Sequence, residues 1–198
     1  MKKALLLSGG MDSTSIAHWK RPDLAIAVDY GQKPAKTELR VARVIADNLR
    51  IPLEVVSVDC SSLGSGDLAG TRQVSLAPTS EWWPFRNQLL VTLALMAAVK
   101  HGVQELMIGT VASDSSHADG RPEFIEAVDA LTRLQEGGIR VTAPALHLTT
   151  VELIRVSSIP KNLLAWAHSC HTGNLACGAC RGCVKYRETY QELGDGAF

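Results

Sequence analysis

The sequence predicts an α/β, Rossmann-like fold in which helices cover both faces of a parallel sheet, followed by a cysteine-rich segment. Apolar runs of strand length alternate with longer stretches of helical periodicity, which is the order expected of a parallel sheet. The first apolar run turns through two adjacent glycines into a helical stretch. Four of the five cysteines lie close together near the C-terminus. We therefore divide the chain into an α/β part, residues 1–160, and a C-terminal segment, residues 161–198.

The elements can be placed in order along the chain. Apolar runs predict strands over residues 4–7, 24–29, 53–59, 105–109 and 139–143. The stretches beside them predict helices over residues 13–20, 35–50, 87–101, 122–135 and 149–157. Residues 61–80 are rich in Gly, Ser, Thr and Pro, so we expect a long loop there, of the kind that usually has a function. Ligands of parallel sheets bind beyond the carboxyl ends of the strands, where residues 8–10 and 29–32 fall.

The composition narrows the class of protein. The chain has 198 residues, 46% of them hydrophobic, and its 20 basic and 20 acidic residues cancel. Without a dense basic run, binding to duplex nucleic acid through clustered Lys and Arg is not expected. No run approaches the roughly 18 apolar residues of a membrane helix, and Gly9 interrupts the apolar stretch near the N-terminus before it could act as a signal peptide. We expect a cytoplasmic protein that binds neither membrane nor duplex.

The first strand, turn and helix have the layout of a phosphate-binding loop. Gly9 and Gly10 can take positive φ and let the backbone approach an anion closely. The first N–H groups of the following helix have no intrahelical partner, and the helix dipole favours negative charge there. Ser8 and Ser13 add hydroxyl donors, and Asp12 could order a Mg²⁺ ion or its water. A plain strand-to-helix turn also favours Gly and Ser, but it does not require hydroxyls on both sides of the glycines.

The loop differs from the commonest phosphate-binding motifs. The P-loop requires G-x-x-x-x-G-K-[ST], and no lysine follows these glycines to reach the β- and γ-phosphates. The dinucleotide fingerprint G-x-G-x-x-G is also absent from it. The sequence Ser-Gly-Gly-x-Asp-Ser instead resembles the pyrophosphate loop of ATP pyrophosphatases. That resemblance implies attack on the α-phosphorus of ATP, release of pyrophosphate and an adenylated intermediate.

Four cysteines have the spacing of metal ligands: Cys170, Cys177, Cys180 and Cys183. Four thiolates form a closed tetrahedral zinc site with no open position, so the metal would be structural and its removal would destabilise the fold. An iron–sulfur cluster is the alternative, because ferredoxins also use C-x-x-C-x-x-C. Disulfides are disfavoured in a cytoplasmic protein. Cys60 stands apart from the cluster, and we interpret it as an ordinary buried thiol.

Further motifs join the loop and the cysteine site into one pattern along nearly the whole chain. They are Asp29-Tyr30-Gly31-Gln32, Arg86-Asn87, Asp119-x-Arg121-Pro122-Glu123-Phe124 and the C-x6-C-x2-C-x2-C site. Together they resemble the 7-cyano-7-deazaguanine synthase family of queuosine and deazapurine biosynthesis, a family of pyrophosphate-loop ATP pyrophosphatases. The resemblance implies an adenine nucleotide alpha hydrolase-like fold and a need for ATP, Mg²⁺ and Zn²⁺.

The resemblance also implies the reaction and its partners. Family members are ligases that adenylate 7-carboxy-7-deazaguanine, aminate it with ammonia to the amide, and use a second ATP to reach the nitrile. They are commonly homodimers, and this sequence leaves the oligomeric state open, with a homodimer among the alternatives. The implied site residues are Ser8, Gly9, Gly10, Asp12, Ser13, Asp29 and Tyr30 for the nucleotide, with Asp12, Arg86, Asp119 and Arg121 for catalysis.

Several of these residues also have a structural interpretation. Arg86 would pair with phosphate or with the substrate carboxylate, yet Arg86-Asn87 can equally cap and position a helix. Asp119 and Arg121 would read the polar edge of the base, yet Arg121-Pro122 also suits a helix start. Asp29-Tyr30 can simply end a strand.

The chain departs from the family's pattern at the substrate end. Lys33-Pro34 replaces a basic-His pair, His168 replaces a Trp, and residues 113–118 replace an aromatic-rich stretch. Residues 82–85, Trp-Trp-Pro-Phe, form either a lid over a planar base or a patch for a partner subunit. These departures permit an enzyme that joins the activated deazaguanine to a protein amine. Two further alternatives are a tRNA-thiolating pyrophosphatase and a zinc-stabilised nucleotide-binding module without activity.

Overall fold

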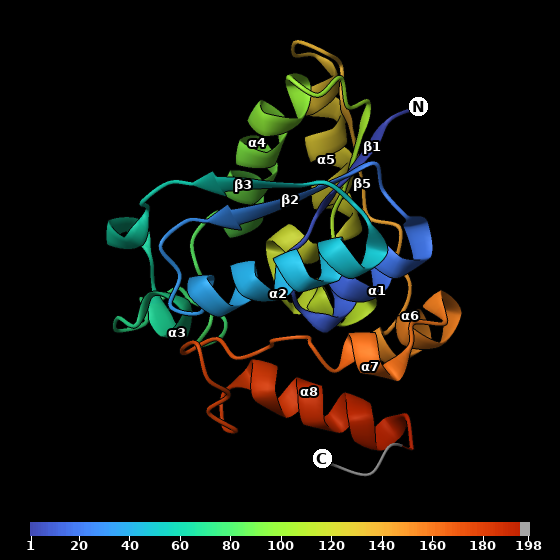
Figure 1. The fold of residues 1–198 in the computed structure, drawn as a ribbon. Helices are drawn as coiled ribbons and strands as arrows, with labels where there is room; N and C mark the ends of the chain where they lie inside the picture. Colours follow the sequence, from blue (N-terminus) through green and yellow to red (C-terminus); the bar gives the residue numbers. More distant parts are fainter. Residues whose placement is uncertain (195–198) are drawn as a thin grey trace.

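The computed structural model describes residues 1–194, and of residues 115 and 116 only the backbone. At its centre lies a parallel five-stranded sheet with the strand order β3-β2-β1-β4-β5 (Figure 1). The strands are β1 (Lys3–Leu6), β2 (Leu24–Asp29), β3 (Leu53–Ser57), β4 (Glu105–Met107) and β5 (Arg140–Thr142). The predicted α/β fold and all five predicted strands are confirmed, although β3, β4 and β5 are shorter than the apolar runs that predicted them.

Helices cover both faces of the sheet (Figure 1). Side chains along β1 alternate between the two cores: Leu5 packs with Ile16 and Ile45 on one face, whereas Ala4 lies in the core of the other face with Ala94. This alternation follows from the two-residue repeat of a strand and explains why the strands are apolar throughout. The first face is covered by α1 (Met11–Lys20), α2 (Ala35–Leu49), α6 (Thr150–Ser157) and α7 (Lys161–Leu164), and the second by α4 (Arg86–Val99) and α5 (Pro122–Arg133).

The structure contains short helices that the sequence did not predict. The expected loop over residues 61–80 includes η1 (Ser61–Leu63) and α3 (Gly66–Ala69), and two further turns, η2 (Ala112–Ser116) and η3 (Ala118–Gly120), follow β4. Elements of three to five residues are too short to show a helical period. Among residues 1–194, no helix combines the length and apolar character needed to span a membrane.

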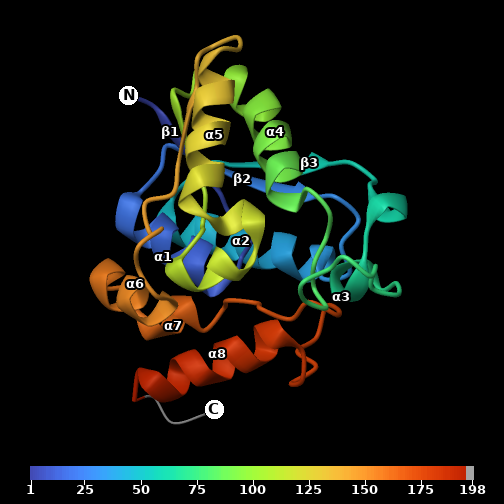
Figure 2. The ribbon, with the colours of Figure 1, turned by 180° about the vertical axis from the view of Figure 1, so that it is seen from behind.

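The most important unpredicted element is α8 (Arg181–Glu192), which starts directly after Cys180. Cysteines and a glycine at its beginning obscure its amphipathic pattern. Its Tyr190 is buried in the same core as Leu153 of α6. In both ribbon views α8 lies beyond α2 and α7, at the end of the molecule opposite α4 and α5 (Figures 1 and 2).

Candidate active site

A cavity of about 520 Å³ opens at the carboxyl ends of β1, β2 and β4, the edge of the sheet where ligands were expected. Its walls come from the loop after β1, the segment before α4, the turns after β4, and helix α8. Of the predicted site residues, those that line it are Ser8, Gly10, Asp12, Ser13, Tyr30 and Arg86. Within the described part of the chain, Gly9, Asp29, Asp119 and Arg121 are not among the lining residues.

The loop after β1 is held in shape by its own polar groups and by α2. Gly9 has φ +78°, and a Cβ there would lie 3.0 Å from both Glu38 O and Val41 Cβ, so only glycine fits this position. The hydroxyls of Ser8 and Ser13 are 3.1 Å apart, and Ser13 Oγ donates to Gly10 O at 3.3 Å. These contacts fix a concave run of backbone and hydroxyl donors at the start of α1.

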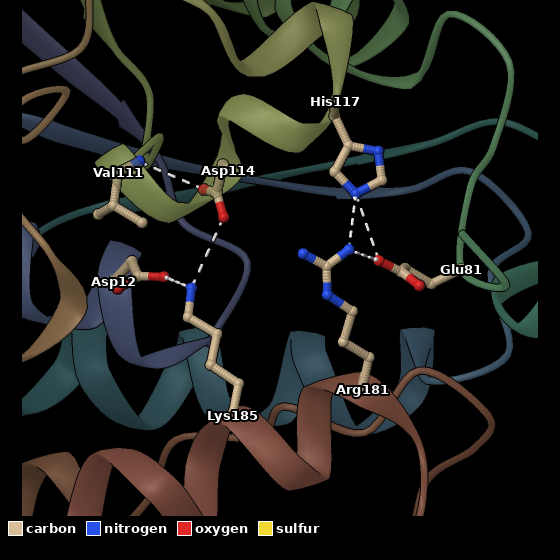
Figure 3. Close-up of polar contacts among 7 residues, drawn as sticks. All are labelled: Asp12, Glu81, Val111, Asp114, His117, Arg181 and Lys185. Carbon is tan, nitrogen blue, oxygen red and sulfur yellow. Dashed lines mark hydrogen bonds and ion pairs between the residues drawn. The ribbon is translucent and has the colours of Figure 1, made fainter. Parts of the chain in front are cut away.

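Asp12 forms an ion pair with a lysine from the other end of the chain (Figure 3). Lys185 Nζ, on α8, lies 3.0 Å from Asp12 Oδ2 and 3.6 Å from Asp114 Oδ1. Asp114 is itself held by the backbone N–H of Val111, which donates to its Oδ2 at 3.2 Å. Burial raises the pKa of Asp12 and the charge of Lys185 opposes that rise. The ammonium group of Lys185 therefore lies beside the phosphate-type loop after β1.

A second polar cluster lies beside the first and contains Glu81, His117 and Arg181 (Figure 3). Arg181 Nη1 lies 2.8 Å and His117 Nε2 3.2 Å from Glu81 Oε1. Burial by itself would raise the pKa of Glu81, but the hydrogen bond with His117 and the charge of Arg181 outweigh it and lower this pKa to about 2. The carboxylate is ionised, so it ties the loop before α4 to α8.

The Arg-Asn pair at the start of α4 is connected to Asp119. The backbone N–H of Asn87 donates to Asp119 Oδ2 at 3.1 Å, and Asn87 Nδ2 donates to Asp119 O at 2.8 Å. Asp119 thus accepts a hydrogen bond from an N–H group in the first turn of α4 that has no partner within the helix. The side chain of Arg86, in the same turn, lines the cavity. These contacts give Asp119 a positioning role, whereas its predicted contact with the base stays a prediction.

Tyr30 and Trp83 form an apolar wall behind the cavity. Both side chains are buried, and their rings meet edge to face with centroids 4.9 Å apart. Trp83 is therefore part of the core, and neither a lid nor a partner patch describes it. Phe85, by contrast, is 77% exposed. The carboxylate of Asp29 accepts the N–H of Gly31 at 3.0 Å and so shapes the turn that follows β2.

Glu38 contributes a further carboxyl group to the cavity, from α2. Its Oε2 accepts a hydrogen bond of 2.8 Å from Gln32 Nε2, and Gln32 Oε1 accepts the N–H of Tyr30 at 2.9 Å. Burial raises the pKa of Glu38 to about 7, although Gln32 and Arg86 act in the opposite direction. This carboxyl group therefore changes charge near neutral pH.

The four predicted metal ligands come together. Their sulfur atoms all lie within 4.8 Å of one another, with 3.9 Å between Cys177 and Cys183 and 4.0 Å between Cys170 and Cys180. A tetrahedral ion bound to sulfur at about 2.3 Å separates its ligands by about 3.8 Å, so the donor set and its size fit zinc. The hydroxyl of Thr172 and backbone N–H groups lower the pKa of Cys177 to about 5, whereas burial raises that of Cys183 to about 12. A cation bound among these sulfur atoms would favour the ionised form of the Cys183 thiol.

The sequence did not predict several titratable residues that α2, α8 and the loops beside them bring to the cavity: Glu38, Glu81, Asp114, His117, Arg181, Lys185 and Glu188. One local signal could have found two of them. Arg181 and Lys185 are four residues apart, so they share a face of any helix that follows the cysteines. The residues that contact this face lie up to 173 positions away in the sequence, so no local sequence pattern indicates the contacts.

The fold and the site define a nucleotide-binding type of α/β protein, with a phosphate-type loop at the sheet edge and, beside it, a cluster of four cysteines that could hold a metal ion. The model of the queuosine biosynthesis protein QueC family matches residues 2–194, and the chain belongs to this family. This result confirms the family resemblance that the motifs predicted, and the chain is an enzyme of that synthase type.

Curated relatives named 7-cyano-7-deazaguanine synthase are similar along almost their full length. The protein from Acinetobacter baylyi is 30% identical, covering 96% of this chain and 90% of the relative. Those from Solidesulfovibrio magneticus and Nostoc punctiforme are 32% and 33% identical, each match covering 98% of this chain and, respectively, 92% and 96% of the relative. Among solved structures, an NMN synthetase from Francisella tularensis has a TM-score of 0.49 and 15% identity, covering 100% of this chain and 79% of that one, which is too distant to support an argument.

Proposed function

We propose that this enzyme adenylates 7-carboxy-7-deazaguanine with ATP and converts the adenylate with ammonia to the amide and then to 7-cyano-7-deazaguanine. The observation that carries the proposal is the Ser8–Ser13 loop in the wall of the cavity, in a chain of the queuosine biosynthesis family. The product is the one named in the relatives' name, 7-cyano-7-deazaguanine synthase. In this proposal residues 1–160 bind the nucleotide and residues 161–198 bind the metal, in the cytoplasm.

The reaction requires that the triphosphate is held in position, and it needs little covalent catalysis by the protein. A carboxylate is a poor electrophile, and attack of its oxygen on the α-phosphorus of ATP expels pyrophosphate and leaves an acyl-adenylate. Ammonia then adds to the acyl carbon and AMP departs with the bonding electrons. A second ATP activates the amide oxygen in the same way, and loss of AMP and a proton gives the nitrile. The main barrier to the reaction is the negative charge that develops on the phosphates. Hydrogen-bond donors held in fixed positions therefore contribute most to the rate.

The proposed roles follow from position. Ser8, Gly10 and Ser13 line the cavity and offer donors to the pyrophosphate, with Gly9 shaping the turn. Asp12 would hold Mg²⁺, which neutralises phosphate charge. Further proposed roles are phosphate or carboxylate pairing for Arg86, contact with the nucleotide for Asp29 and Tyr30, and recognition of the polar edge of the base for Asp119 and Arg121.

The metal would stabilise the C-terminal segment and take no part in the reaction, because four thiolates leave no open position. Its ligands would be Cys170, Cys177, Cys180 and Cys183. The contribution of the C-terminal segment to the active site is helix α8, which it places against the cavity.

Mass spectrometry of the products tests the proposal. Purified enzyme is incubated with 7-carboxy-7-deazaguanine, ATP, Mg²⁺ and ammonia, and AMP, pyrophosphate and deazapurine products are quantified. The expected result is the nitrile, with two AMP and two pyrophosphate for each nitrile, as the two activation steps require. Formation of only ADP and orthophosphate would overturn the adenylation, and adenylate formation without any reaction with ammonia would favour transfer to a protein amine.

A further inference from the structure

The cavity receives a lysine that the loop itself lacks. Lys185 lines the cavity from α8, and its Nζ lies 3.0 Å from Asp12 in the first turn of α1. A P-loop places its lysine directly after the glycines, where it reaches the β- and γ-phosphates. Here the residues after Gly10 are Met, Asp and Ser, and the cation arrives from 173 positions away along the chain.

Two anchors fix Lys185 in this position. At its start, α8 follows Cys180 and includes Cys183, two members of the proposed metal site. Towards its end, Tyr190 is buried in the main core. These two anchors hold the face that carries Lys185 towards the loop. Figure 3 shows its side chain rising from α8 between Asp12 and Asp114.

The partners of Lys185 lie in the wall of the cavity. Its side chain is 34% exposed, and those of Asp12 and Asp114 are 18% and 38% exposed, so a ligand in the cavity can reach the ammonium group. A phosphate in the Ser8–Ser13 loop would lie next to both Asp12 and the ammonium group. The ammonium can then exchange a carboxylate for a phosphate oxygen, which releases Asp12 for a metal ion.

From this geometry we infer that Lys185 is the pyrophosphate-binding cation of the enzyme, supplied by the C-terminal segment in place of a loop lysine. The inference deepens the proposed function and rests on it. Lys185 contacts the β- and γ-phosphates of ATP directly, and the metal-bound start of α8 serves to deliver it.

Calorimetric binding of inorganic pyrophosphate and of ATP, with and without Mg²⁺, tests the inference on zinc-loaded full-length protein. Lys185→Met should weaken both ligands by roughly ten- to a hundredfold, as expected for loss of a charge-assisted contact. Lys185→Arg should restore part of the affinity. Lys36→Met, which removes an exposed lysine of α2, is the matched control and should bind as the parent does.

The outcomes separate direct contact from action through Asp12. Weaker pyrophosphate binding in the absence of Mg²⁺, with an unchanged thermal midpoint, supports direct contact. A loss that occurs only with Mg²⁺ overturns the inference, because Lys185 would then act by orienting Asp12. If the parent protein itself binds neither pyrophosphate nor ATP, the proposed function fails; if the parent binds and Lys185→Met binds equally, only this inference fails.

Discussion

The backbone N–H of His168 donates a hydrogen bond of 2.9 Å to the carbonyl oxygen of Gly9. The chain segment that leads to the cysteine cluster is thus attached to the phosphate-type loop itself. A second attachment lies nearby, where Thr37 of α2 donates through its N–H and its hydroxyl to Asn174, each at 2.9 Å. The cysteine-rich segment is therefore joined directly to the loop and to α2.

Metal removal is predicted to abolish ATP binding and to lower stability together. Loss of a structural metal costs several kcal/mol, and about 1 kcal/mol shifts the midpoint of a chain of this size by roughly 2–4 °C, so a fall on the order of 10 °C is expected. Thermal unfolding and ATP binding are measured during stepwise chelation, with zinc and iron quantified. Cys180→Ser should reproduce the loss, whereas Cys60→Ser, outside the cluster, should not. ATP binding that survives complete chelation would contradict the prediction, and a stoichiometric, redox-active iron signal would contradict zinc.

The two loop glycines should differ in their response to alanine. At Gly9 the positive φ and the 3.0 Å approach of Glu38 O and Val41 Cβ leave no room, so Gly9→Ala should cost at least about 1–2 kcal/mol of unfolding free energy. At Gly10 the φ is −75° and the nearest atom to a new Cβ, Ser8 Oγ, lies 3.6 Å away. Gly10→Ala should therefore fold normally but bind ATP more weakly, because it lines the cavity. Equal stability of the two variants in urea would refute this distinction.

Two substitutions at Asp119 separate helix positioning from recognition of the base. Asp119→Ala removes the acceptor for the N–H of Asn87, so we expect a loss of about 1 kcal/mol in unfolding free energy, as for other lost helix caps. Asp119→Asn keeps an acceptor oxygen and should fold nearly as the parent does. If Asp119 also reads the base, the Asn variant should bind 7-carboxy-7-deazaguanine more weakly while binding ATP normally. Loss of both ligands in the Asn variant, at parental stability, would remove the role in base recognition.

How much of this structure can be predicted from the sequence depends on how far apart along the chain the contacting residues lie. The strands and the loop at the sheet edge were predictable, because an apolar run such as residues 4–7 and its glycine turn are local patterns. The cysteine cluster was predictable from spacing for the same reason. The position of Lys185 in the cavity was not predictable, because its partner Asp12 lies near the opposite end of the chain. Trp83 was predicted to belong to a lid or a partner patch, and it is buried instead in a core that it shares with Tyr30, a residue distant in the sequence.

The stability of the enzyme should depend on pH through Glu38. Its pKa in the folded protein is about 7, against an ordinary value of 4.5. Between these values the folded state binds more protons than the unfolded state, so the unfolding free energy falls as pH rises from about 4.5 through 7. Glu38→Gln keeps an acceptor for Gln32 but carries no charge. It should therefore match the parent near pH 5 and exceed its unfolding free energy by on the order of 2 kcal/mol at pH 8.

Urea denaturation at pH 5, 6, 7 and 8 provides the measurement, and Glu126→Gln on the exposed side of α5 is the matched control. The control removes a carboxylate that water already solvates, so its difference from the parent should stay flat across the series. A flat profile for Glu38→Gln as well would mean that Glu38 is ionised in the folded state throughout the series. Because Glu38 lines the cavity, the same variant should also flatten any change in ATP affinity that follows ionisation near pH 7, since a negative charge beside the phosphates weakens their binding.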